Sequence, residues 1–292
     1  MPENSIFMRY PVTPDVNKYL RLFRFGNGVM GIVGIVVGAL LAAGTDMVDH
    51  LLWIVIGCAI VVIFMAGGNA INDYIDREID TTAHPDRPIP MGEIEPETAR
   101  NLGYAFMLIA VLISLPCAAL DVGGGWVTTV MVVVCAVLML AYETVLKQRG
   151  FVGNVTIAFL TAMIFMVGGA VTGRPWDNVV FACMAFLVSV GREIAKDIED
   201  MESDEGRRTL PMIVGERRAA LIGTAFFVLG PVLSVYPAVA GEASWAYYLV
   251  IVADAMFLYC AYMVTKDAHR AQKTAKYAMA VALVAFILDV IV

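Results

Sequence analysis

The chain has 292 residues, of which 60% are apolar and only 16% are charged, and its formal net charge is −7. Soluble domains are nearer half apolar and a quarter charged, so this composition excludes an ordinary soluble protein. The negative net charge gives no reason to expect a nucleic-acid partner.

Residues 1–24 are polar and contain prolines, unlike a signal peptide, so we expect the first apolar segment to be retained. Nine apolar segments of about 20 residues follow, each long enough to cross a hydrocarbon core of roughly 30 Å as a helix. They lie at approximately 25–44, 51–71, 99–120, 123–142, 152–172, 177–195, 219–240, 244–265 and 274–292. We therefore predict an all-α polytopic membrane protein with nine transmembrane helices around a central cavity, in a single domain over residues 1–292. A soluble protein with buried helices would not repeat this length nine times.

The basic residues predict the orientation of the chain in the membrane. With nine spans, 19 of the 20 Lys and Arg residues fall on the side that holds the N-terminus, and only Arg174 falls on the other side. Cytoplasmic loops of membrane proteins are enriched in Lys and Arg. We therefore predict a multi-pass protein of the cell membrane with a cytoplasmic N-terminus and an external C-terminus.

A row of carboxylates follows the second span. In NAINDYIDREID, residues 69–80, Asp73, Asp76 and Asp80 have the spacing D-x-x-D-x-x-x-D. Steps of three and four residues place all three side chains along one helical face.

The sixth span ends in a second row with the same spacing, formed by Asp197, Asp200 and Asp204. The rows are 124 residues apart, and each is followed by a proline-containing loop that ends in Gly-Glu, RPIPMGE and TLPMIVGE. Four spans separate the rows, so both should open on the cytoplasmic side and face one cavity. We predict two parallel four-helix repeats, at about 18–145 and 146–265, followed by a ninth helix. Transporters also contain repeats, so the repeat does not select a function.

The paired rows predict a magnesium site. Clustered carboxylates repel one another unless a cation neutralises them. Mg²⁺ takes oxygen ligands, commonly one or two carboxylates together with substrate phosphate oxygens. Asn69 and Asn72 add neutral oxygen atoms beside the first row. A solvated acidic loop could explain one row, but it does not explain two rows of equal spacing on one side.

Basic residues beside the rows predict a diphosphate substrate. Arg87 lies in the proline-rich segment HPDRPIP, and Lys147 follows the fourth span in YETVLKQRG. Arg, Lys and Mg²⁺ together can hold a diphosphate and stabilise the charge that develops as it leaves. With apolar helices beneath, the expected substrate is an isoprenyl diphosphate whose tail lies among the spans, where water cannot quench a carbocation.

The segments NDYIDREID, KDIEDMESD, RPIP and YETVLK resemble those of the UbiA-type intramembrane prenyltransferases over essentially the whole chain. The resemblance implies nine transmembrane helices and Mg²⁺-dependent prenyl transfer at the cytoplasmic face. GREIAKDIED is most similar to the archaeal digeranylgeranylglyceryl phosphate synthase branch. That branch implies transfer of geranylgeranyl from its diphosphate to the sn-2 hydroxyl of geranylgeranylglyceryl phosphate, a step in ether-lipid synthesis.

The resemblance also implies roles for individual residues. The implied Mg²⁺ ligands are Asn72, Asp76, Asp200 and Asp204, with Asp73, Asp80 and Asp197 in support. The residues implied to handle the diphosphate are Arg87, Tyr142 and Lys147. The implied catalytic residues are Asp76, Asp200, Lys147 and Arg87. Met91 and Ser203 replace the Ser and Gly that are common in the family, which affects loop geometry and removes no ligand.

The acceptor is predicted from the resemblance alone. A glycerophosphate acceptor would need further cationic contacts, for which Arg192, Lys196, Arg207 and Arg208 are candidates, although the charge bias of cytoplasmic loops explains them equally well. An aromatic acceptor in quinone synthesis is the alternative.

Asp254 supports an alternative hypothesis for the function of the protein. It lies near the middle of the eighth span, where a charged group is costly and functional by default, as in a cation-coupled transporter. Such a transporter would carry polar groups along a path through the bilayer, whereas the polar clusters of this chain lie at one face. Asp254 hydrogen-bonded to a neighbouring helix is the simpler interpretation.

Overall fold

The computed structural model describes residues 15–202 and 208–292, which form helices and connecting turns without a strand. The long helices of this part of the chain are α2 (Phe25–Ala43), α3 (Leu51–Ile75), α5 (Pro96–Leu120), α6 (Gly125–Thr144), α7 (Phe151–Ala170), α8 (Val179–Glu199), α10 (Glu216–Ala240), α11 (Val250–Met263) and α12 (Ala268–Ile291). The short helices are α1 (Asp15–Leu22), α4 (Arg77–Ala83), α9 (Leu210–Val214), and the 3₁₀ segments η1 (Gly44–His50), η2 (Leu146–Gln148), η3 (Asp200–Glu202) and η4 (Trp245–Leu249). The all-α prediction is confirmed.

Within the described residues, seven stretches are long and apolar enough to cross a membrane. The first, Phe25–Ile75, contains both α2 and α3, and the others correspond to α5, α6, α7, α10, η4 with α11, and α12. Helix α8 is not among them, because its C-terminal half carries Arg192, Glu193 and Lys196. The chain is therefore a multi-pass helical membrane protein.

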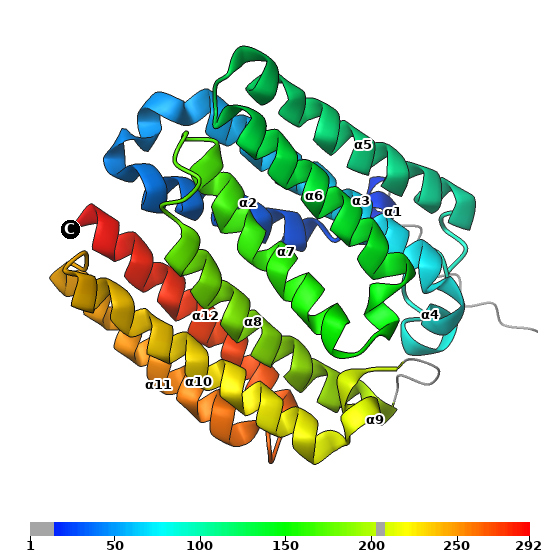
Figure 1. Ribbon diagram of the computed structural model, residues 1–292. Helices are drawn as coiled ribbons and strands as arrows, with labels where there is room; N and C mark the ends of the chain where they lie inside the picture. Colours follow the sequence, from blue (N-terminus) through cyan, green and yellow to red (C-terminus); the bar gives the residue numbers. More distant parts are fainter. Residues whose placement is uncertain (1–14, 203–207) are drawn as a thin grey trace, which may run out of the picture.

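The long helices pack side by side in the order of the chain (Figure 1). Helix α3 packs against α2 and α5, and α8 packs correspondingly against α7 and α10. The two halves meet where α2 packs on α7, and α12 contacts α11, α8 and α2. The acid-bearing ends of α3 and α8 lead into α4 and α9, which lie at the same end of the bundle (Figure 1).

Glycines allow the close approach of α2 and α7. A Cβ atom on Gly38 would lie 2.5 Å from the carbonyl oxygen of Phe165, and one on Gly168 would lie 2.5 Å from that of Ile35. The hydrophobic effect does not drive helices together inside a lipid bilayer. The association of two helices there depends on close van der Waals packing of this kind.

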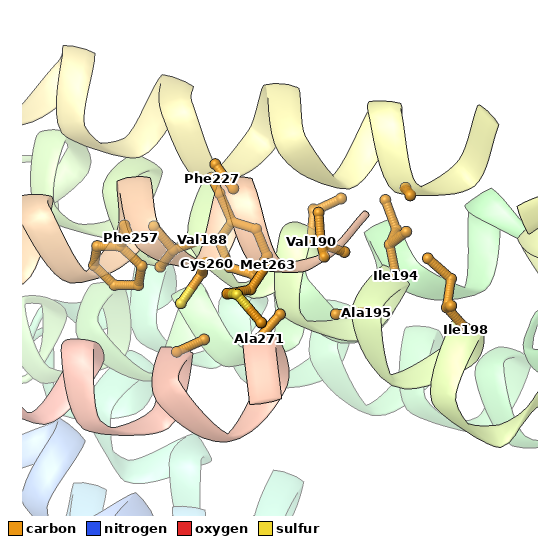
Figure 2. Close-up of a cluster of buried hydrophobic side chains, with 14 of the residues drawn as sticks. Val188, Val190, Ile194, Ala195, Ile198, Phe227, Phe257, Cys260, Met263 and Ala271 are labelled. Carbon is orange, nitrogen blue, oxygen red and sulfur yellow. The ribbon is translucent and has the colours of Figure 1, made fainter. Parts of the chain in front are cut away.

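The second half of the chain packs around its own apolar cluster. Figure 2 shows Val188 and Ile194 of α8 together with Phe227 of α10 and Phe257 of α11. The rings of Phe227 and Phe257 are stacked with centroids 6.5 Å apart. This cluster fills the space between α8, α10 and α11, and it forms a solid wall beside the cavity described below.

Several predicted boundaries differ from the structure; the ninth segment, for example, was predicted from residue 274, whereas α12 begins at Ala268. The sixth apolar segment was expected to end near residue 195, but α8 continues to Glu199, because its charged last turn still forms helical hydrogen bonds after leaving the apolar zone. The eighth was expected to begin at 244, but residues 245–249 form η4, in which the side chain of Ser244 accepts a hydrogen bond from the N–H of Ala246.

Candidate active site

The first row of acids lies where α3 passes into α4. Asp76 ends α3, with its N–H donating to the carbonyl of Asn72 at 2.9 Å, and the N–H of Asp80 donates to the carbonyl of Asp76 at 2.8 Å. The row is therefore divided between two helices, where the spacing predicted one continuous face. The side chains still come together, and Asp73, Asp76 and Asp80 are only 1%, 6% and 2% exposed.

Two arginines neutralise the outer acids of this row. Arg87 Nη1 lies 2.5 Å from Asp80 Oδ2 and 3.4 Å from Asp73 Oδ1. Arg24 Nη2 donates to Asp73 Oδ1 at 2.7 Å and to Asn72 Oδ1 at 3.0 Å. A buried carboxylate is stable only when it is paired and hydrogen-bonded, so these arginines are required for the acids to be buried in ionised form.

The central acid belongs to a second network that reaches α6. Lys147 Nζ, in η2, lies 2.5 Å from Asp76 Oδ2 and 3.2 Å from Glu143 Oε2. Asn72 Nδ2 donates to the same two oxygens, at 3.2 Å to Asp76 and 3.0 Å to Glu143. Glu143 is 5% exposed. The network therefore holds the end of α3 against the end of α6.

A tight turn connects Lys147 to the region of the second row. Gly150 has φ +56°, and a Cβ atom there would lie 2.8 Å from Ile213 Cδ1 of α9. A residue with a side chain would be strained at this φ, and its Cβ atom would force the end of the Ile213 side chain to shift. The turn thus brings the loop of Lys147 against the helix that follows the second row.

The second row begins at the end of α8. Asp197 lies in α8 and accepts a hydrogen bond from Asn154 Nδ2 of α7 at 2.9 Å, while Asp200 lies in η3. The oxygen Oδ1 of Asn154 is buried and has no hydrogen-bond partner. The predicted ligand Asp204 and the candidate Arg207 lie outside the described residues.

The other residues predicted to bind substrate lie at the ends of α6 and α8 and just before α9. Tyr142 is half-buried at the end of α6, beside Glu143. Arg192 Nη1 lies 2.5 Å from Glu193 Oε1 of the same helix, and its buried Nε has no partner. Lys196 and Arg208 are exposed. A contact of Arg192 or Lys196 with an acceptor stays a prediction.

A cavity of about 280 Å³ lies inside the bundle, between α2, α3 and α7 on one side and α8, α10, α11 and α12 on the other. Its lining is almost entirely apolar, with Met65 as the contribution of α3. Met65 precedes Asn72 by seven residues, which is about 10 Å along a helix. The cavity thus begins about two turns below the first row of acids.

Asp254 lies in the wall of this cavity. Its Oδ2 is 2.7 Å from Ser234 Oγ on α10, and the same hydroxyl is 2.8 Å from the carbonyl of Pro231. Asp254 is therefore hydrogen-bonded to a neighbouring helix, the simpler of the two interpretations of this residue.

Sequence reasoning missed Arg24 and Glu143. Glu143 could have been found from its i, i+4 spacing to Lys147, a pair that favours contact on a helix. Arg24 precedes the first apolar segment and looked like an ordinary cytoplasmic residue. Its left-handed backbone, φ 47°, separates α1 from α2 and could not be foreseen for an arginine.

Residues 32–287 match the UbiA prenyltransferase family. The chain belongs to this family. It is 36% identical over 282 residues to a digeranylgeranylglyceryl phosphate synthase of Methanopyrus kandleri, covering 93% of this chain and 98% of that protein. It is also 36% identical over 286 residues to a protein of the same name from Thermococcus kodakarensis, covering 94% and 98%.

Solved structures related to the UbiA family share the fold. One, described as giving insights into the biosynthesis of digeranylgeranylglyceryl phosphate synthase in membranes, superposes with a TM-score of 0.81 at 28% identity and covers 96% of this chain and 99% of that one. A UbiA homologue from Archaeoglobus fulgidus bound to GPP and Mg²⁺ superposes with a TM-score of 0.65 at 17% identity, covering 94% and 99%.

The chemistry of the donors fits the Mg²⁺ that the UbiA family implies. In the described part of the chain the contacts above join four carboxylates to three cationic side chains, which leaves an excess of negative charge. The amide of Asn72 and the carboxylates of Asp76 and Asp200 supply the hard oxygen atoms that Mg²⁺ prefers. Among residues 15–202 and 208–292, no three acidic, His or Cys side chains form a ready-made metal cluster.

Proposed function

We propose that the protein is a Mg²⁺-dependent prenyltransferase. It transfers geranylgeranyl from geranylgeranyl diphosphate to the sn-2 hydroxyl of geranylgeranylglyceryl phosphate and releases diphosphate, a step in archaeal ether-lipid synthesis. The observation that carries the proposal is the buried network of acids and bases about two turns above an apolar cavity. The Methanopyrus and Thermococcus relatives, named for this product, support the choice of acceptor.

Basic side chains of the site bind the diphosphate. Lys147 and Arg87 already lie against the acids, so their cationic groups need move little to reach phosphate oxygens between the two rows. Tyr142 lies on the same helical end as Glu143 and supplies a hydroxyl donor. Asn72, Asp76, Asp200 and Asp204 would hold Mg²⁺, which would neutralise charge on the leaving diphosphate.

The reaction requires an allylic carbon next to the site and a dry tail chamber. The bond between C1 and oxygen breaks, and its electron pair leaves with the diphosphate. The acceptor's hydroxyl oxygen then bonds to C1, and its proton passes to a carboxylate or to the diphosphate. The apolar cavity below the acids would hold the tail among side chains that exclude the water that would quench the cation.

The acceptor's phosphate needs positive charge beyond that used for the diphosphate. Arg192 and Lys196 lie on the last turns of α8, on the same helix as Asp197. The buried and unpartnered Nε of Arg192 is a donor available to such a phosphate. We assign these two residues to the acceptor.

We further propose that all nine long helices cross the membrane, with the N-terminus and the active site at the cytoplasmic face and the C-terminus outside. The bias of Lys and Arg to one side supports this orientation. The corresponding neighbours of α3 and α8 support two parallel repeats, at about 18–145 and 146–265, within one domain.

The test is an assay of the purified protein in lipid with labelled geranylgeranyl diphosphate and Mg²⁺. Separate reactions contain geranylgeranylglyceryl phosphate, 4-hydroxybenzoate or a dihydroxynaphthoate, each with an EDTA control. We expect EDTA-sensitive product with the glyceryl phosphate alone. Product with an aromatic acceptor alone would move the function to quinone synthesis, and no product from folded protein would reject prenyl transfer.

A further inference from the structure

We propose that Asn154 of α7 binds the hydroxyl group of the acceptor through its Oδ1 atom and so orients the oxygen that attacks the prenyl carbon. The inference rests on the proposed function. It adds to that function a hydrogen-bond acceptor outside the two rows of acids, and it assigns to this residue the recognition of an alcohol as the nucleophile.

Asn154 has a buried amide group of which only one end has a partner. The residue is 5% exposed. Its Nδ2 atom donates to Asp197 Oδ2 at 2.9 Å, and because an ionised carboxylate only accepts hydrogen bonds, this contact identifies the end of the amide that faces α8. The Oδ1 atom is buried and has no hydrogen-bond partner among the described residues. A buried acceptor without a partner costs free energy, so this oxygen favours a ligand that brings a donor.

The segment that contains Asn154 contacts both rows of acids. Lys147, in η2, contacts Asp76 of the first row, and Asn154, seven residues later, contacts Asp197 of the second row. The start of α7 packs against η2 at Gly153, where an added Cβ atom would lie 3.4 Å from the Cα atom of Lys147. Asn154 thus contacts the second row while it adjoins the loop that carries Lys147, the residue proposed to bind the diphosphate.

Asn154 also lies on the face of α7 that lines the apolar cavity. Thr161, seven residues later on α7, is one of the lining residues. Residues i and i+7 share one face of a helix, and seven residues span about 10 Å. Asn72 has the same relation to the cavity on α3, where Met65 is the lining residue. The two amides therefore lie on the cavity-lining faces of α7 and α3, about two turns from the lining residues.

The chemistry of the proposed substrates selects the hydroxyl as the partner of this oxygen. An amide oxygen accepts hydrogen bonds and donates none. The prenyl chain and the ionised phosphates carry no N–H or O–H group, whereas the acceptor carries one hydroxyl, at sn-2. A hydrogen bond from this hydroxyl to Asn154 Oδ1 leaves the lone pairs of the hydroxyl oxygen free to attack C1. An amide is too weak a base to take the proton, which still passes to a carboxylate or to the diphosphate.

The test compares the acceptor with its 2-deoxy analogue, in which hydrogen replaces the hydroxyl. Binding of each to the full chain is measured in lipid with Mg²⁺ and inorganic diphosphate, so that no turnover occurs. The wild type should bind the acceptor about 3- to 10-fold more tightly than the analogue, which is the effect of one neutral hydrogen bond. Asn154→Ala should bind the two within about 2-fold of each other, because neither can then form this hydrogen bond.

Turnover gives a second measurement. Asn154→Ala should lower kcat by about 10-fold or more, because the attacking oxygen is no longer oriented. The KM for geranylgeranyl diphosphate and the Mg²⁺ concentration for half-maximal rate should change little. More of the prenyl group should be released as geranylgeraniol, since water then competes with the alcohol for the carbocation. Asn101→Ala, the same substitution at an exposed position on α5, should change none of these quantities.

A wild type that binds the analogue as tightly as the acceptor would overturn the assignment, as would an Asn154→Ala variant that keeps the full preference for the hydroxyl. A raised Mg²⁺ requirement in Asn154→Ala with that preference intact would place the oxygen on the metal, since Mg²⁺ also binds amide oxygens. A wild type without Mg²⁺-dependent product would instead reject the proposed function. If Asn154→Ala does not fold, Asn154→Ser, whose shorter side chain cannot reach the same hydroxyl, provides the same readout.

Discussion

Asp76 joins the proposed Mg²⁺ ligands to the proposed diphosphate-binding residues, because Lys147 and Asn72 both contact its Oδ2 atom. Asp76→Asn keeps the shape and removes the charge, so we expect kcat/KM to fall by about 10²-fold or more, in line with the loss of one preorganised electrostatic contact. Asp200→Asn should have the same effect. The check is the prenyl-transfer rate, with the thermal midpoint measured alongside. Asp46→Asn, exposed in η1, is the control. Full activity of either variant would contradict the metal assignment.

Glu143 orients Lys147 and Asn72 together, since one of its oxygens accepts from both. Glu143→Gln should raise the Mg²⁺ concentration needed for half-maximal rate by about 10-fold, as expected when the group that orients a metal ligand is changed. Glu143→Asp, which restores the charge, should recover part of the loss. Glu193→Gln changes an acid that contacts only its own neighbour Arg192 in the described contacts, and should have no such effect. An unchanged Mg²⁺ dependence in Glu143→Gln would show that Glu143 has only a packing role.

Arg24 combines backbone strain with a contact to the first row. Its φ of 47° disfavours an L-residue with a side chain by about 1–2 kcal/mol, yet its guanidinium binds Asp73 and Asn72. Arg24→Gly should therefore raise KM for the prenyl diphosphate several-fold while lowering the thermal midpoint only modestly, because relief of the backbone strain offsets part of the lost ion pair with the buried Asp73. Arg24→Lys should preserve more of the affinity while keeping the strain. Equal losses of stability and affinity in Arg24→Gly would argue that the arginine is structural.

The acids of the site could be predicted from sequence, whereas their partners could not. Spacing of three and four along an apolar segment is a local property, so Asp73, Asp76 and Asp80 could be recognised from the chain alone. The pairing of Asp76 with Lys147 spans 71 residues and depends on how α3 packs relative to α6. The contact of Arg24 with Asp73 depends in addition on a left-handed residue. The bend at Asp76 was missed for the same reason, because hydrophobic periodicity does not reveal where a helix is capped.

At the scale of the element, α2 and α7 provide a test of helix packing. Gly38→Ala places a Cβ atom against the backbone of α7, where no side chain can yield, so we expect a loss of about 1–3 kcal/mol. Gly26→Ala, on the same helix with nothing within 4 Å of the added atom, should be neutral or stabilising. The comparison requires thermal unfolding in one detergent. Equal midpoints for the two variants would mean that α2 and α7 are not held in close contact.

The ends of a helix could be predicted from sequence where the helix is as long as its apolar, lipid-spanning segment. The predicted 25–44 and 152–172 agree with α2 and α7 to within two residues, since apolar length and helix length coincide there. The predicted and observed boundaries differ at α8, because the helix extends past the end of its apolar segment. They also differ at η4, because Ser244 caps a 3₁₀ helix there. Charged residues end a hydrophobic segment without ending a helix, so Asp197 lies within α8 although the apolar segment was predicted to end near residue 195.

At the scale of the whole molecule, the two acid rows share one face only if α8 crosses the membrane. Four long helices, α5 to α8, separate the rows along the chain, and α8 is the one whose charges exclude it from the apolar stretches. Its last turns carry Arg192, Lys196 and Asp197, and these would be costly in hydrocarbon. They are accommodated if they lie at the cytoplasmic surface or face the cavity between the repeats, where the buried Asn154 already contacts Asp197.

This topology predicts opposite labelling on the two sides of α8. Trp176, which is exposed, lies in the loop before α8, and Arg208, whose side chain is also exposed, lies after α8. In intact cells a membrane-impermeant maleimide should label Trp176→Cys, while Arg208→Cys should be labelled only after permeabilisation. Among the native cysteines, Cys183 is exposed four residues into α8, so each variant is read against the labelling of the unchanged protein. Val292→Cys should behave like Trp176→Cys, because α10, α11 and α12 add an odd number of crossings. Labelling of both loop variants from the same side would mean that α8 does not span, and the two acid rows would then face opposite sides of the membrane.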